Sequence, residues 1–253
     1  MTNDKQYTDN MNPAAPENIG RNRKFVPEIQ SKLRADYIKA PEIIRDASGI
    51  RLYGSRIKSI IFTTDIAIIA NTNADAILAV FPFTPQPSIF EAISNIAVTP
   101  FFAGVGGGKT NGKRSAKMAT FAEAFGCYGV VLNAPASIET IQLVADEVDC
   151  PIISTIISEY MDIESRLRAG VNILNVSASK DTPKVIREIR KTYPTIPIIA
   201  TGGPTEESIR ETIEAGANAI TFMPPSNRNI FQETMDRYRA TAEIYYENQH
   251  KLV

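Results

Sequence analysis

The feature that most restricts the fold of this sequence is an internal repeat of about 46 residues. The segment PIISTIISEY, which begins at Pro151, aligns with PIIATGGPTE, which begins at Pro197. Farther along, AGVNILNVS from Ala169 aligns with AGANAITFM from Ala215, and a fainter copy begins with PFFAGVGGG at Pro100. Each copy contains two short β-branched runs bounded by Pro or Gly, and a helical stretch follows each run. The repeat therefore predicts strand–helix units in series.

Eight strand signals occur along the chain. They are Lys58–Thr63, Ala76–Phe81, Val98–Gly104, Tyr128–Asn133, Ile152–Ile157, Ile173–Ser177, Ile196–Thr201 and Ala219–Met223. Helical patterns separate them at Pro87–Asn95, Arg114–Phe125, Ile138–Val148, Met161–Ala169, Pro183–Lys191 and Glu206–Glu214, and a long one follows at Ile230–Gln249. Because the strands are apolar throughout, they suit a parallel sheet covered by helices on its outer side. Eight units in about 190 residues predict a single α/β domain, a (βα)8 TIM barrel. An open doubly wound sheet is the alternative.

The first 57 residues lie outside this repeat. We therefore predict an N-terminal extension over residues 1–57, whose first 24 or so residues are disordered, and a barrel domain over residues 58–253. Short helices are predicted at Glu28–Ile38 and Glu42–Ala47, on either side of Pro41. Either helix is suited to plug the bottom of the barrel or to pack on another subunit.

Charge and hydropathy exclude several kinds of partner. The formal net charge is −1 and the sequence pI about 6.0, so no basic surface is expected to hold a nucleic acid or an anionic membrane. No run approaches the roughly 18 apolar residues of a membrane span, and the N-terminus has no signal-peptide core. We expect a cytoplasmic homo-oligomer that binds a small anionic molecule. Cys127 and Cys150, each beside a strand, are expected to be reduced core thiols.

Histidine is almost absent from the chain. The single histidine, His250, stands three residues from the C-terminus. A Ser-His-Asp triad, a Cys-His pair or a histidine-bound metal would have to use that residue. Acid–base chemistry is therefore expected to fall to Asp, Glu, Lys or Tyr, and no cofactor is expected.

One segment resembles a nucleotide-binding P-loop. Residues 103–110 read AGVGGGKT, with Ala in place of the first Gly. In a true P-loop the Lys and Thr begin a helix whose dipole and N–H groups hold the phosphates. Here the turn signal Asn111-Gly112 delays the helix to about Lys113. No apolar strand ends in a suitably placed Asp for Mg²⁺, so the segment is predicted to be the loop after the third barrel strand.

The glycines of this loop still suggest an anion site. Successive N–H groups of Gly106, Gly107 and Gly108 at the end of a barrel strand can point toward an anion, with Lys109 beside them. The alternative is a loop whose glycines only satisfy a tight turn. Both interpretations remain open at this point.

The segment IIATGGPTEESIRETIEAGANAI carries a family resemblance. It resembles the phosphate-binding half of the ribulose-phosphate-binding barrels, through Thr201, Gly202, Gly203 and the turn at residues 215–217. The match covers roughly a tenth of the chain and implies phosphate contacts from the amides of Gly202 and Gly203. The whole chain also looks like a family of uncharacterised bacterial barrel proteins that sometimes carry a generic hydrolase label.

Two features depart from that phosphate-binding pattern. The loop after the eighth strand reads FMPPSN, and its two prolines lack N–H donors. Glu206 and Glu207 occupy the first turn of the preceding helix, where their charge complements the dipole. Ser226 and Asn227 are the alternative donors. We expect an anion between these two loops, and an ordinary capped helix is the competing interpretation.

Candidates for chemistry are polar residues that follow barrel strands. Besides those already named they include Asp65, Asn133, Ser158, Glu159, Asn175, Ser177, Ser179 and Lys180. Lys180 is a candidate Schiff-base residue, since a desolvated lysine amine attacks carbonyl carbon. The alternative is a solvated lysine paired with Asp181.

Two carboxylates are candidates for general base and acid. Asp65 and Glu159 suit these roles if both face one cavity, and with Asn133 their oxygen atoms are a candidate Mg²⁺ site. Alternatively, Asp65 caps the short helix over IAII, and Glu159 opens an acidic first turn.

Together these patterns predict a barrel enzyme that acts on a small phosphorylated or carboxylated metabolite. By analogy with such barrels, the reaction is lysis or isomerisation at a carbonyl group. A non-catalytic ligand sensor and a hydrolase that activates water with Asp, Glu or a metal are the alternatives.

Overall fold

The computed structural model describes residues 27, 29, 31, 33, 34 and 36–250 of the 253-residue chain. The chain divides into two compact units, Met1–Asp36 and Tyr37–Val253. The second unit contains every helix and strand described below. The predicted disorder of the first 24 residues lies outside the described residues.

Eight parallel strands form a closed barrel. They are β3 (Ser59–Phe62), β4 (Ala76–Ala79), β5 (Phe101–Gly106), β6 (Gly129–Leu132), β7 (Ile152–Ile156), β8 (Ile173–Val176), β9 (Ile198–Thr201) and β10 (Ala219–Phe222). Neighbours in sequence pair throughout, and β10 closes the barrel by pairing with β3. The predicted TIM barrel is therefore confirmed, and the open doubly wound sheet was the wrong alternative.

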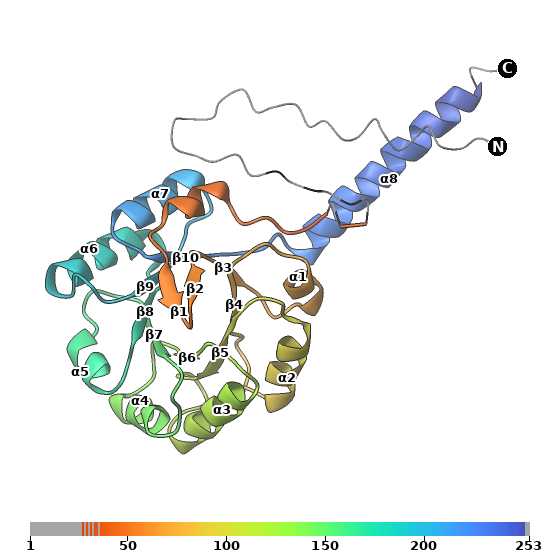
Figure 1. Ribbon diagram of the computed structural model, residues 1–253. Coiled ribbons are helices and arrows are strands. Elements are labelled where there is room, and N and C mark those ends of the chain that lie inside the picture. The colour runs from red at the N-terminus through yellow and green to blue at the C-terminus, as the bar shows by residue number, and fades with distance from the viewer. Residues whose placement is uncertain (1–26, 28, 30, 32, 35, 251–253) are drawn as a thin grey trace. The chain divides into compact units, whose positions relative to one another are not determined.

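Helices follow the strands and cover the outside of the barrel (Figure 1). They are α1 (Ile66–Ala70), α2 (Pro87–Ile96), α3 (Lys113–Ala124), α4 (Ile138–Ala145), α5 (Ile163–Arg168), α6 (Thr182–Thr192), α7 (Glu206–Glu214) and α8 (Asn227–His250). A short 3-10 helix, η2 (Ser179–Asp181), precedes α6. The start of α3 at Lys113 confirms the turn predicted at Asn111-Gly112.

Two apolar layers hold the barrel together. One fills the interior, where Phe102 is almost fully buried among residues such as Leu78 and Val131. The other lies between the sheet and the helices and includes the fully buried Phe90. Cys127 and Cys150 are buried free thiols, as predicted. Because successive residues of a strand face opposite sides, apolar strands supply both layers at once.

A β-hairpin, instead of a helix, closes the bottom of the barrel. Strands β1 (Ile50–Leu52) and β2 (Ser55–Ile57) pair antiparallel, and their apolar side chains join the interior layer. Tyr53 and Gly54 form the turn with φ of 46° and 86°, as two-residue hairpins require. The Tyr53 ring packs edge-on against Tyr128, just before β6. Figure 1 shows the hairpin across the barrel axis.

The helices predicted before this hairpin are partly correct. A 3-10 helix, η1 (Glu42–Asp46), occurs where the second was predicted. The first was predicted at Glu28–Ile38, and its described residues contain no helix, because Ile38 is held in an extended bridge to Thr72. Ile44 of η1 is 1% exposed and joins the outer core, and η1 lies beside α7.

The long helix α8 is the exception among the barrel helices. Near its start Ile230 packs on the outer core, whereas the side chains from Met235 to Tyr245 are all exposed. Within the described part of the chain, no helix is both long and apolar enough to cross a membrane.

The buried position of η1 makes it part of the barrel core. We expect Ile44→Ala to lower the free energy of unfolding by about 2–5 kcal/mol, because it leaves a cavity between η1 and α7. Urea denaturation followed by circular dichroism measures this change. Glu42→Ala, an exposed position of the same helix, is the control and should change stability by no more than about 0.5 kcal/mol. Equal stability of both variants would show that η1 is not part of the core.

Candidate functional site

The mouth of the barrel is lined by a layer of side chains that is polar on one side only. Alternate residues of a strand face the same side, so the residue two positions after each interior residue also points into the barrel. These residues form the layer at the mouth. Its members, from β3 to β10, are Phe62, Val80, Gly104, Asn133, Thr155, Asn175, Thr201 and Thr221. The half from β3 to β5 is apolar, and the half from β6 to β10 carries amides and hydroxyls. This layer contains no ionisable side chain.

The polar half holds unused hydrogen-bonding capacity. Asn175 donates from Nδ2 to Thr155 Oγ1 at 3.3 Å, but its Oδ1 is buried without a partner. Thr221 Oγ1 is likewise buried and unpartnered. Exchanging the oxygen and nitrogen of the Asn175 amide does not change this, because only one end of the amide has a hydrogen-bond partner. Such atoms are rare in folded proteins and often mark functional sites.

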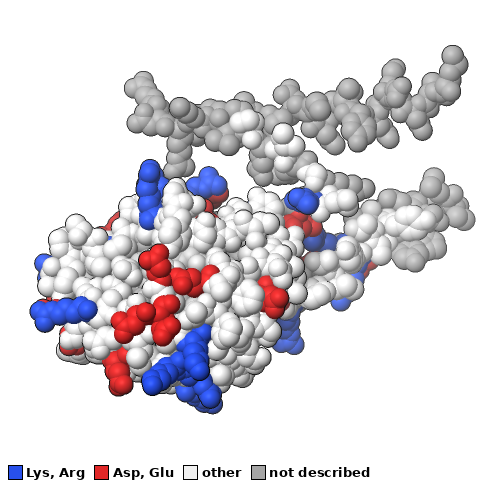
Figure 2. Space-filling model, turned by 60° about the horizontal axis from the view of Figure 1, so that its bottom comes forward, with Lys and Arg blue, Asp and Glu red and all other residues white. Residues whose placement is uncertain are grey.

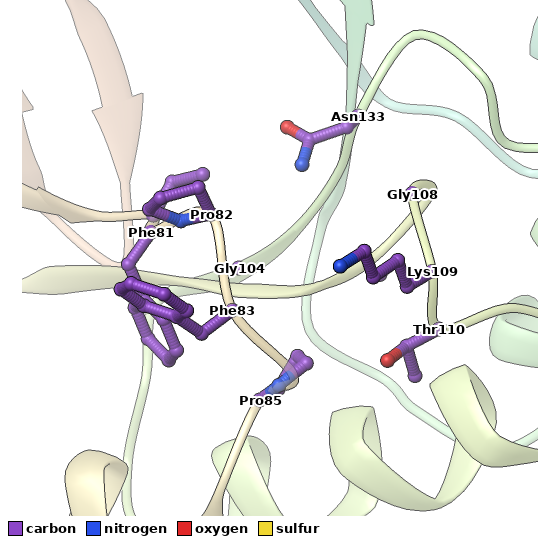
Figure 3. A pocket seen from close by; sticks show the side chains of 11 residues that line it. Phe81, Pro82, Phe83, Pro85, Gly104, Gly108, Lys109, Thr110 and Asn133 are labelled. Atoms are coloured by element: carbon purple, nitrogen blue, oxygen red, sulfur yellow. The ribbon is translucent and has the colours of Figure 1, made fainter.

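A cavity of about 180 Å³ opens beside the apolar half of this mouth. It is lined by Val80, Phe81, Pro82, Phe83, Pro85, Gly104, Gly106, Gly108, Lys109, Thr110 and Asn133. Figure 3 shows the segment from Phe81 to Pro85 on one side and Lys109 on the other, with the lysine amine pointing into the space between them. The Asn133 amide faces the same space. The structure thus brings together three predicted residues, Gly108, Lys109 and Asn133.

The glycines of the β5–α3 loop have different functions. A Cβ at Gly106 would lie 2.0 Å from Ser115 Oγ, and one at Gly107 would lie 2.5 Å from the backbone N of Asn133. Gly107 also has a φ of +94°. Both glycines are therefore required by close packing. A Cβ at Gly108 would meet nothing within 4 Å, so its lack of a side chain serves no packing purpose.

The loop lacks the P-loop geometry. Lys109 and Thr110 lie ahead of α3, and the Thr110 carbonyl accepts hydrogen bonds from Gly107 N–H and Ser115 Oγ. A β-bulge between Gly104 and Gly106 bends β5 before the loop. Bulges of this kind re-aim the chain and are common beside active sites.

Arg166 of α5 fixes the loop after Asn133. The residue is 8% exposed, and its guanidinium donates to the carbonyls of Ala134 and Ala136 and to Ser154 Oγ. Burial lowers the pKa of this arginine. The sequence offered no signal for this role, because the partners are backbone carbonyls about 30 residues away.

The predicted anion site between the β9 and β10 loops has several donors already engaged. Gly202 N–H donates to the Thr221 carbonyl at 3.0 Å, and Asn227 Nδ2 donates to Asp65 Oδ2 at 2.8 Å. Ser226 Oγ accepts from Asn229 N–H in the first turn of α8. The amide of Gly203 and the hydroxyls of Thr201 and Ser226 are the remaining predicted donors, because Ser226 Oγ only accepts in this bond.

The first turn of α7 is satisfied from within the chain. Thr205 and Ser208 form a capping box over it. Hydrogen bonds from its own N–H and from Thr205 hold the pKa of Glu207 below its ordinary value. The first turn of α7 is thus capped as in an ordinary helix, and the anion site between the two loops stays a prediction.

Asp65 and Glu159 are not brought together. Asp65 caps α1 by accepting from the N–H groups of Ala67 and Ile68 at 2.8 and 3.2 Å. The hydrogen bond from Asn227, with the bonds from the helix, lowers the pKa of this carboxyl. Glu159 is paired with Lys184 at 2.8 Å, which lowers its pKa. The strands that precede them, β3 and β7, are opposite one another in the barrel.

A magnesium site does not fit these residues. Among the described residues, no three His, Cys, Asp or Glu side chains are grouped closely enough to hold a metal ion. Asp65 and Glu159, with Asn133, made up the conceivable set, and the two carboxylates are engaged on opposite sides of the barrel. No step of the proposed function is therefore assigned to a metal.

Lys180 lies in η2, beyond the end of β8, and its side chain is exposed. It does not line the cavity at the β5 loop. Ser177, just before it, donates its backbone N–H to the Ile156 carbonyl. A Schiff-base role for Lys180 remains a prediction.

Phe81 and Phe83 were missed from the sequence. Phe81 ends the predicted strand Ala76–Phe81 and Phe83 follows it, and apolar residues at the end of a barrel strand were a usable signal. The sequence analysis considered only polar side chains after the strands as candidates for chemistry, so it did not include these two aromatic residues.

Comparisons by sequence find no relative. No protein-family model matches the chain, and no curated protein matches it.

Comparison of structures finds distant similarity. A phosphoenolpyruvate phosphomutase from Streptomyces platensis subsp. rosaceus matches with a TM-score of 0.54 and 15% identity, over 77% of this chain and 84% of that one. The phosphonopyruvate hydrolase complex with oxalate and Mg²⁺ matches with a TM-score of 0.52 and 14% identity, over 76% and 83%. A 2,3-dimethylmalate lyase of the PEP mutase/isocitrate lyase superfamily has a TM-score of 0.54 and 14% identity, over 79% and 85%. At these identities the likeness shows the TIM-barrel fold.

The buried Gly107 and the exposed Gly108 should respond differently to a methyl group. We expect Gly107→Ala to lower the free energy of unfolding by about 2–4 kcal/mol, because it combines a left-handed φ with a backbone clash. Gly108→Ala, its matched control, should change it by no more than about 0.5 kcal/mol. Thermal and urea unfolding of both variants measure this difference. Similar losses for the two variants would contradict the described loop conformation.

The cap formed by Asp65 should be pH-dependent. We expect Asp65→Ala to lower the free energy of unfolding by about 1 kcal/mol at pH 7. The folded-state pKa lies below the ordinary 3.8, so the charged form stabilises the protein above that pH. This contribution is lost as the pH falls through the folded-state value. Urea denaturation at pH 7 and pH 2 should therefore show a smaller difference from wild type at pH 2, and an undiminished difference would contradict a charge-dependent cap.

Proposed function

We propose that this chain is an enzyme that binds a small phosphorylated or carboxylated metabolite in the cavity at the β5–α3 loop. The observation that carries the proposal is the convergence of Gly108, Lys109 and Asn133 on one cavity at the carboxyl ends of barrel strands. This end of a TIM barrel is where catalytic sites are built.

The charge at the cavity suits an anion. Lys109 supplies an ammonium group, and the exposed backbone of Gly108 lets an oxyanion approach the N–H groups of the loop. The cavity residues include no carboxylate. Phosphate and carboxylate oxygens both accept from such donors, so either group satisfies the site.

The size of the cavity restricts the ligand. A cavity of roughly 150 Å³ in another protein accommodates benzene. At about 180 Å³, this one suits a ligand of about six to eight non-hydrogen atoms. A short 2-oxo acid is of that size, and inorganic phosphate is slightly smaller. The apolar side formed by Phe81 and Phe83 suits the carbon skeleton of such an acid.

The reaction class that we favour is lysis or isomerisation at a carbonyl group. An ammonium group beside a carbonyl oxygen stabilises the enolate that both reactions form. The fold is shared with a phosphoenolpyruvate phosphomutase and a 2,3-dimethylmalate lyase, which supports this class by analogy.

A non-catalytic sensor is the second candidate. The mouth layer carries no ionisable side chain, and the acid–base candidates Asp65, Glu159 and Lys180 lie outside the cavity. A binding protein needs no such group. Turnover of an identified ligand distinguishes the enzyme from the sensor. The hydrolase alternative has less support, because both carboxylates that would activate water are engaged elsewhere.

Ligand binding is tested by thermal shift. We expect pyruvate, oxalate or phosphate at about 100 times its Kd to stabilise the protein by roughly 2.7 kcal/mol, which raises Tm by several degrees. Lys109→Ala should abolish the shift, whereas Lys117→Ala, an exposed lysine on α3, should retain it. If the ligand still raises Tm in Lys109→Ala, the ligand binds at another site. If no ligand raises the Tm of the wild type, the proposal is contradicted.

Borohydride reduction tests whether Lys109 or Lys180 forms a Schiff base. With pyruvate present, a Schiff base is trapped as a stable adduct that mass spectrometry locates. An adduct on Lys180 supports the Schiff-base prediction, and one on Lys109 assigns that chemistry to the cavity.

A further inference from the structure

The helix α8 presents an apolar stripe to solvent. Phe231, Met235, Tyr238 and Tyr245 are each more than two-fifths exposed, and Ala242 lies between the last two. Their spacing is four, three, four and three residues, which places them along one side of a helix. A 4-3 spacing is the heptad pattern of helices that pair with one another.

The barrel does not cover this stripe. Ile230, one residue before it, is the apolar side chain of α8 that packs on the outer core. From Met235 to Tyr245 every described side chain is exposed, on all sides of the helix. Helices in water gain most of their stability from packing of an apolar face. The part of the stripe from Phe231 to Tyr238 therefore suits a partner surface.

We propose that α8 pairs with α8 of a second copy of this chain, antiparallel, around a two-fold axis at Tyr238. In this arrangement Phe231 of one copy lies opposite Tyr245 of the other. Met235 lies opposite Thr241, one residue from Ala242, so a large side chain faces two small ones, as interdigitating packing requires. The two Tyr238 side chains meet on the axis. The stripe is thus complementary to itself, as an isologous interface must be.

The charges of α8 favour the antiparallel direction. The first half, residues 227–239, contains Arg228, Arg237 and Arg239 against Glu233 and Asp236. The second half, residues 240–250, contains two glutamates and no lysine or arginine. Antiparallel pairing sets the net-positive half of one helix beside the net-negative half of the other. Parallel pairing sets like charges together.

The area is sufficient for a specific contact. At their exposures, the three aromatic side chains offer on the order of 100–150 Å² each. With Met235 and flanking atoms, two helices together remove on the order of 1,000 Å² from water, which is near the lower limit for specific interfaces. Aromatic residues and Met are also the types enriched at interface centres.

Sedimentation equilibrium of the full chain tests the pairing. We expect wild-type protein to have twice the monomer mass of 27.8 kDa. Tyr238→Glu, which puts two like charges on the axis, should sediment as a monomer. Ala240→Glu introduces the same charge on the opposite side of the helix and should remain a dimer. A monomeric wild type, or a dimer that Tyr238→Glu leaves intact, would overturn the proposal.

Cysteine cross-linking tests the direction. Only a residue on the two-fold axis meets its own copy in an antiparallel pair. Under oxygen, Tyr238→Cys should therefore form an interchain disulfide readily, and Phe231→Cys should not. Equal cross-linking at both positions would indicate a parallel pair and contradict the proposed arrangement. Circular dichroism of each variant checks that the barrel remains folded.

Discussion

Closure of the parallel sheet is the constraint on which the rest of this structure depends. The pairing of Ile220 with Ser59 joins the last strand to the first and leaves the barrel with no open sheet edge. A closed barrel must fill its interior, so each strand contributes apolar residues to both faces. Closure also brings all eight carboxyl ends to one rim. Residues from distant parts of the chain, such as Lys109 and Asn133, therefore share a cavity without any contact specific to them.

The geometry of that rim is determined locally by close backbone approach. Gly106 and Gly107 allow β5 and its loop to lie against Ser115 and Asn133, and the bulge in β5 turns the chain outward there. Lys109 is aimed into the cavity as a result of this path, and Arg166 fixes the neighbouring loop by its carbonyls. The position of the Lys109 side chain thus depends in part on Gly107 and Arg166, which do not line the cavity.

Much of the fold was predictable because its signals are local and repeated. Apolar β-branched runs and the helical patterns between them gave all eight strands, and Asp65 before IAII indicated a cap. The hairpin at residues 50–57 was missed because its strands have only three residues each. The alternation of apolar and polar residues around Tyr53-Gly54 was a usable signal for a hairpin turn. Of the site, the glycine loop with Lys109 was predicted from its composition. The hydrogen bonds of Gly202 and Asn227 were not, because their partners are set by barrel closure and lie far away in sequence.

The hairpin at the bottom has a consequence for the side from which a ligand can reach the barrel. Ile50, Leu52 and Ile57 cover the lower end of the interior with packed apolar atoms. Above them the side chains of the strands fill the interior, so no passage runs through the barrel. A small molecule therefore reaches the strand ends only from the rim, and arrival and departure take place on the same face.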